Sequence, residues 1–159
     1  MTQELSIAVV ELKSEHRDAM LDLVLTWATI DGALSMLLAN VRSKSWVDAA
    51  DEIRKLRGSN KLAQVIRALK DLENGAEAAR KLCKIKRRYE KHSKLRDHIA
   101  HSRCIGASEV DPNCIVFLTF ERVGENRLAM YQVPVEEMRE ANSWGVDFVH
   151  LLYRLTRKE

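Results

Sequence analysis

A four-three repeat of apolar residues runs through residues 14–42, and it constrains the fold more than any other feature of the chain. Positions 20, 24, 27, 31, 34, 38 and 41 share one face of a helix, and all but one of them are apolar. This stripe predicts a long helix from about Ser14 to Arg42 that buries one face. The exception is Asp31, because a carboxylate is costly at a buried position unless it is paired or in contact with water.

Helix-breaking residues are scarce in the rest of the chain as well. The 159 residues include only 2 Pro and 6 Gly, and 46% hydrophobic with 31% charged residues is a composition typical of a globular protein. Further apolar stripes predict helices at about residues 46–56, 62–72, 76–102 and 134–155. We therefore expect one helical domain over residues 1–159.

The clearest β signal lies at residues 114–133. Two runs of strand-forming residues, 114–120 and 127–133, flank a turn that contains Gly124 and Asn126. A lone hairpin is marginally stable in water, so it should lie on the helices or on a second subunit. The expected fold class is all-α: a bundle of four to five helices with a β-hairpin inserted at about residues 114–133, before the last helix.

Positive charge is concentrated in the fourth predicted helix. Residues 80–96 hold nine Lys or Arg and one acid, Glu90, which gives a local charge of +8 in a chain of net charge +3. A run of this kind is either a solvated helix face or a surface that binds phosphate groups.

The number of cysteines and the hydropathy of the chain favour a cytoplasmic location. The 3 Cys are odd in number and match no metal-ligand spacing, so we expect neither a disulfide framework nor a metal site. We see no secretory signal at the N-terminus and expect no membrane span in the chain. A cytoplasmic protein without cofactor is the expectation.

The segment SKLRDHIAHSR, residues 93–103, carries the most concentrated chemistry. Asp97 and His101 are four apart, so they lie on one helix face, where a carboxylate can fix the tautomer of an imidazole for proton transfer near neutral pH. Arg96 precedes His101 by five residues, about 140° around the helix. Its own length or a partner chain must bring its guanidinium to His101. His98 faces away from Arg96, so we expect it at a surface or an interface.

One histidine, one arginine and no metal suit the cleavage of RNA. The imidazole can move a proton to or from the reacting oxygens, and the guanidinium can hold the phosphate as negative charge builds up. RNA supplies its own nucleophile, the 2′-hydroxyl, so no activated Ser or Cys is needed. The structural alternative is a helix C-terminus whose cations complement the helix dipole.

LRDHIAHS resembles the signature of the HEPN superfamily: Arg, a polar residue, roughly three to five further residues and then His. Arg96, Asp97 and His101 occupy these positions. A second match, from Arg87 to His92, is interpreted as coincidental. The resemblance implies a homodimer with two motifs facing each other across the interface. It also implies either a metal-independent endoribonuclease that leaves a cyclic phosphate, often a toxin or a phage-defence component, or a catalytically inactive relative.

These observations assign a role to each candidate residue. We expect His101 to be the general acid or base, Arg96 to clamp the phosphate and Asp97 to orient His101. Accessory residues are Asp31 and His92, and the cations expected to contact RNA are Arg88, Lys91 and Lys94. An antitoxin or a regulatory protein is a further expected partner. Two further hypotheses remain: a non-catalytic module that binds nucleic acid or a partner protein, and a purely structural dimer subunit.

Overall fold

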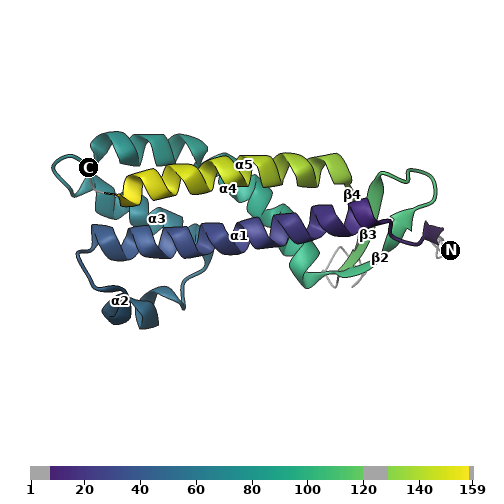
Figure 1. Ribbon diagram of the computed structural model, residues 1–159, viewed down its shortest axis with the longest axis horizontal. Coiled ribbons are helices and arrows are strands. Elements are labelled where there is room, and N and C mark those ends of the chain that lie inside the picture. The colour runs from purple at the N-terminus through teal and green to yellow at the C-terminus, as the bar shows by residue number, and fades with distance from the viewer. Residues whose placement is uncertain (1–7, 120–128, 158–159) are drawn as a thin grey trace. The chain divides into compact units, whose positions relative to one another are not determined.

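The computed structural model describes residues 8–119 and 129–157 (Figure 1). The elements found in this part of the chain are, in order, β1 (Val9–Val10), α1 (Ser14–Val41), α2 (Trp46–Ile53), α3 (Gly58–Lys70), α4 (Ala76–His101), β2 (Arg103–Ser108), β3 (Cys114–Thr119), β4 (Ala129–Pro134) and α5 (Val135–Thr156).

The expected all-α class is wrong, because the fold is mixed. Of the described residues, 69% are helical, but the strands among them form a four-stranded antiparallel sheet in the order β1-β2-β3-β4. The predicted hairpin is confirmed as the ladder between β3 and β4, which runs from Cys114 opposite Pro134 to Thr119 opposite Ala129. The predicted turn residues Gly124 and Asn126 lie outside the described residues.

The sequence did not predict strand β2, because β2 contains Gly106 and glycine is more typical of a loop than of a strand. Gly106 sits at a shift of register between β2 and β3, with a φ of +142°, a conformation that favours glycine. A Cβ at this position would lie 2.7 Å from the carbonyl oxygen of Val10. The glycine therefore permits both the bulge and the close approach of β1.

The predicted helices agree with the observed ones apart from details at their ends. α3 begins at Gly58 rather than after it, and its N-cap residue, Arg57, makes no side-chain capping hydrogen bond. Trp46, the first residue of α2, keeps 53% of its surface exposed. Pro134 ends β4, so α5 starts one residue later.

The expectation that no segment resembles a membrane span needs correction. Among the described residues, α1 is long and apolar enough to cross a membrane by length and composition alone. A core helix of a soluble protein passes the same test, and α1 contributes Leu23, Ile30 and Leu34 to the fully buried side chains. The finding is consistent with a soluble protein.

The chain divides into two compact units. The first, here called the sheet unit, comprises residues 1–25 and 94–143, and the second, the helical unit, comprises residues 26–93 and 144–159. The expected single domain over residues 1–159 stays a prediction.

The sheet unit has a core centred on β3. Ile115, Val116 and Phe117 are fully buried in consecutive positions, so both faces of this strand are covered. Met138 and Ala141 of α5 are also fully buried. β3 is the central strand that positions β2 and β4 on either side of it.

The helical unit has an aromatic centre. The ring of Trp27 from α1 stacks on that of Tyr89 from α4 with 6.3 Å between centroids, and it lies 6.1 Å from that of Trp144 from α5. Gly145 lets α5 approach closely, since a Cβ there would lie 2.6 Å from Cγ2 of Thr26. Aromatic contacts of this kind add to the free energy gained from burial.

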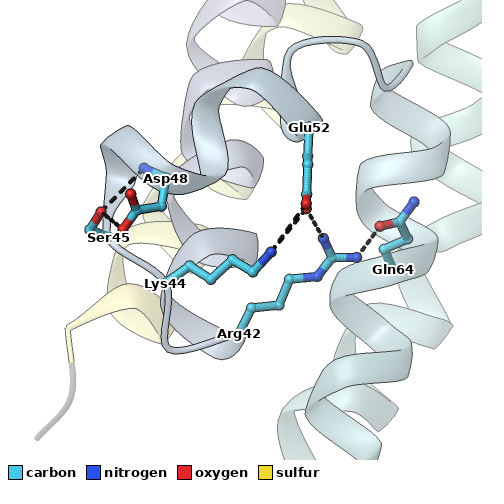
Figure 2. A network of polar contacts seen from close by, with 6 residues as sticks. All are labelled: Arg42, Lys44, Ser45, Asp48, Glu52 and Gln64. Carbon is cyan, nitrogen blue, oxygen red and sulfur yellow. Dashed lines mark hydrogen bonds and ion pairs between the residues drawn. The ribbon is translucent and has the colours of Figure 1, made fainter.

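Polar contacts hold the connection between α1 and α2 within the helical unit (Figure 2). Glu52 accepts ion pairs from Lys44 at 3.1 Å and from Arg42 at 3.6 Å, and Arg42 also donates to Gln64 of α3. Ser45 caps α2 by accepting a hydrogen bond from the backbone N–H of Asp48. These contacts join the segment after α1 to α2 through Glu52 and to α3 through Gln64.

Candidate functional site

A cleft of about 470 Å³ in the sheet unit, here called the histidine cleft, brings the end of α4 together with β3 and β4. It is lined by Lys94, Asp97, His98, His101, Ser102, Thr119 and Tyr131.

One face of α4 forms a wall of this cleft. Lys94, Asp97, His98 and His101 follow the spacing i, i+3, i+4 and i+7, which places side chains on the same side of a helix. The predicted same-face placement of Asp97 and His101 agrees with this arrangement. Two imidazoles, a carboxylate and an ammonium group therefore share one concave surface.

His98 is the residue that sequence reasoning missed. Its ring lies 4.6 Å from that of Tyr131 on β4, centroid to centroid, at an interplanar angle of 38°. Both side chains are partly buried. The three-residue spacing of His98 and His101 was a signal for a shared helix face, but the sequence could not show that Tyr131 lies beside it.

Arg96 does not line the histidine cleft. Its Nη1 pairs with Oδ1 of Asp97 at 3.1 Å, and its side chain is 30% exposed. Its Nε is buried and has no hydrogen-bond partner among the described residues. The 140° offset predicted from helix geometry agrees with this separation, and the cation that the structure brings to the two histidines is Lys94.

The structure pairs Asp97 with Arg96, whereas the sequence predicted that Asp97 would orient His101. Asp97 is about half exposed, and the partner that the structure gives it is Arg96. Asp97 therefore has contacts with both other motif residues' surroundings: it lines the cleft together with His101, and it forms an ion pair with Arg96.

The accessory residue Asp31 belongs to the helical unit, where it forms an ion pair with Lys61 of α3. Nζ of Lys61 donates to Oδ2 of Asp31 at 2.6 Å. The lysine side chain is 4% exposed and the aspartate side chain 47%. Asp31 therefore keeps a buried ammonium group paired while remaining in contact with water.

The second accessory residue, His92, is buried in the aromatic centre of the helical unit, with 1% of its surface exposed. Its ring contacts those of Trp27 and Trp144, at 6.4 and 5.2 Å between centroids. Nε of Arg88 lies 3.4 Å from Nε2 of His92, and the guanidinium lies 6.0 Å from the Trp144 ring. His92 therefore presents no accessible surface to a phosphate, and Arg88 is engaged by this centre.

A basic stripe runs along the part of α4 that belongs to the helical unit: Arg80, Lys84, Arg87 and Lys91, spaced by four, three and four residues. All four are exposed, and none forms an ion pair with an acid in the described part of the chain. Lys81, off the stripe, pairs with Glu77 at 2.7 Å; this bond and the charges of Lys81 and Arg80 lower the pKa of Glu77.

The other sites on the described surface carry less chemistry. A cleft of about 590 Å³ in the helical unit is lined by Arg42, by residues of α3 and by Asp71, and none of them is a histidine. No group of three or more His, Cys, Asp or Glu side chains suited to a metal ion occurs among the residues described. Cys114 is buried, and burial together with the hydrogen bond to Asp111 raises the pKa of its thiol.

Comparison with known proteins adds no relative: no protein-family model, curated protein or solved structure matches the chain.

The Asp31–Lys61 pair predicts an asymmetry between its two members. Asp31→Asn leaves a buried ammonium group without its carboxylate, so we expect a loss of about 2–3 kcal/mol, somewhat below the cost of breaking a fully buried pair. Lys61→Met fills the same space with an apolar chain and leaves a half-exposed carboxylate in water, so a change within about 1 kcal/mol is expected. Urea denaturation of both variants measures the difference. Equal losses in the two variants would contradict the expected asymmetry.

Proposed function

We propose that the protein is a metal-independent endoribonuclease that cleaves RNA in the histidine cleft. The observation that carries the proposal is the position of His101, which shares one cleft-facing side of α4 with Lys94 and Asp97. The chemistry of these groups suits phosphodiester cleavage: an imidazole that moves a proton, and an ammonium group that offsets the charge of the phosphate.

The reaction is an internal transfer within the RNA. The 2′-oxygen attacks the adjacent phosphorus as its proton leaves, the bond from phosphorus to the 5′-oxygen breaks, and that oxygen gains a proton. The products are a 2′,3′-cyclic phosphate and a 5′-hydroxyl end. The nucleophile comes from the substrate, so the protein needs to supply only proton transfer and charge stabilisation.

The HEPN resemblance supports this proposal through its motif, with Asp97 and His101 in the cleft and Arg96 paired to Asp97. In this proposal the protein acts in the cytoplasm as a homodimer, in which Arg96 of one subunit clamps the phosphate held near His101 of the other. A role as a toxin or phage-defence component, restrained by an antitoxin, belongs to the same proposal.

The basic stripe favours a second candidate, a module that binds RNA without cleaving it. Four exposed cations on one helix face can neutralise phosphates whether or not the cleft is active. Under the nuclease proposal, the same stripe holds the substrate backbone.

His101→Ala is expected to lower RNA cleavage about 10²- to 10⁴-fold, because one proton transfer loses its catalyst. The assay is single-turnover cleavage of labelled RNA in the presence of EDTA, with mass spectrometry of the new 3′ end. His150→Ala, which removes an exposed histidine of α5, is the matched control and should cleave at the wild-type rate. Cleavage that stops with EDTA, or equal rates for both variants, would contradict the proposal; binding without any cleavage would favour the second candidate.

Mixing Arg96→Ala with His101→Ala tests whether two subunits complete the site. In a two-fold dimer, random exchange places half of the chains in mixed dimers, each with one intact combination, so roughly a quarter of wild-type activity should return. Each variant is incubated alone and with the other before the cleavage assay. If both residues act within one chain, the mixture is as inactive as its components.

The basic stripe predicts a change in the salt dependence of binding. Lys84→Gln with Lys91→Gln should reduce the slope of log K against log salt by about 1.4 for single-stranded RNA, because two phosphate contacts are lost. Lys55→Gln with Lys70→Gln removes the same charge from exposed lysines elsewhere and should leave the slope nearly unchanged. Fluorescence anisotropy at several salt concentrations provides the values. Identical slopes for the two pairs would show that the stripe is only a solvated face.

A further inference from the structure

We infer that His98 is a second catalytic residue of the histidine cleft, which performs the proton transfer that His101 does not. The inference rests on the proposed RNA cleavage and deepens it. Cleavage requires a base for the 2′-hydroxyl and an acid for the departing 5′-oxygen, and a single imidazole cannot hold and lack a proton at the same moment.

The positions of the two histidines suit a divided task. His98 and His101 line the same cleft from one face of α4, and residues three apart on a helix have Cβ atoms about 5–6 Å from each other. Two imidazoles at this separation can reach two oxygens of one phosphodiester. Imidazole is also the side chain whose ordinary titration range suits both roles near neutral pH.

Tyr131 is the positioning residue for His98. Its ring contacts the imidazole at 4.6 Å, centroid to centroid, and its backbone pairs with that of Phe117 in the ladder between β3 and β4. Phe117 is fully buried, so the backbone of Tyr131 is paired with a strand that lies in the core. A fixed ring plane limits the orientations of His98, which proton transfer requires.

Charged and polar groups from α4 and from the sheet lie beside these two imidazoles. α4 contributes the ammonium group of Lys94 and the carboxylate of Asp97, besides the two imidazoles themselves. β4 contributes the phenol of Tyr131. Ser102 and Thr119 add uncharged hydroxyls.

The step conserves atoms and charge. One imidazole takes the 2′-hydroxyl proton as the bond from the 2′-oxygen to phosphorus forms. The other, as imidazolium, gives its proton to the 5′-oxygen as the bond from phosphorus to that oxygen breaks. The two imidazoles end with exchanged protonation states, and water restores them before the next turnover.

The first experiment is the pH profile of RNA cleavage by the full-length protein. Wild type should give a bell-shaped profile, because one imidazole must be neutral and the other protonated. His98→Gln should cleave about 10²- to 10⁴-fold more slowly and lose one limb of the bell. His150→Gln is the control and should keep the wild-type profile. A bell-shaped profile at the wild-type rate in His98→Gln overturns the inference while leaving the proposed function intact.

The second experiment uses an RNA with sulfur in place of the bridging 5′-oxygen. A thiolate leaves without a proton, so the variant that lacks the acid should recover and the variant that lacks the base should not. We expect one of His98→Gln and His101→Gln, and only one, to recover on this substrate. Recovery of both or of neither overturns the division of roles.

Two variants of Tyr131 distinguish a role in positioning His98 from a role in folding alone. Tyr131→Phe preserves the ring and should preserve kcat, whereas Tyr131→Leu should lower kcat and keep both limbs of the pH profile. Circular dichroism of both variants controls for folding. Equal kcat in Tyr131→Phe and Tyr131→Leu would contradict the positioning role. If the wild-type protein cleaves no RNA under any condition, the proposed function itself fails.

Discussion

The site depends on the short connection between α4 and the sheet. Ser102 is the single residue between the end of α4 at His101 and the start of β2 at Arg103. Because β2 is hydrogen-bonded to the buried strand β3, the last turn of α4 cannot rotate freely about its own axis. The face that carries Lys94, His98 and His101 is therefore fixed with respect to β3 and β4.

This constraint explains why two residues of one motif take different environments. A helix face can present residues at i, i+3, i+4 and i+7 to a cleft, but not the residue at i+2, which lies on the opposite side of the helix. Arg96 falls outside the face, and its guanidinium instead reaches the carboxylate of Asp97. Arg96 is thus connected to the cleft by its ion pair with Asp97, although it does not line the cleft itself.

Much of the helical layout could be predicted, because apolar stripes report directly on which helix face is buried. The limits of α1 and α4 agree within one residue with those expected from periodicity. The hairpin of β3 and β4 also followed from a local pattern. The sheet as a whole did not, since β2 contains Gly106 and depends on pairing with residues distant in the sequence, which local patterns do not record.

The candidate site divides in the same way. The shared face of Asp97 and His101 follows from spacing alone, whereas the partners of Asp31 and His98 depend on tertiary contacts. The apolar spacing around Asp31 indicated that this carboxylate needed a partner, but the sequence offered 26 Lys and Arg and no means of choosing Lys61 among them.

The bulge at Gly106 has a consequence for solubility. β1 is only two residues long, yet Val9 and Val10 pair with Ser108 and Ala107 and so occupy part of the outer edge of β2. An open strand edge is a template on which another chain can add and start aggregation. By admitting the backbone of Val10 beside it, Gly106 allows a two-residue strand to cover an edge that the sheet would otherwise expose.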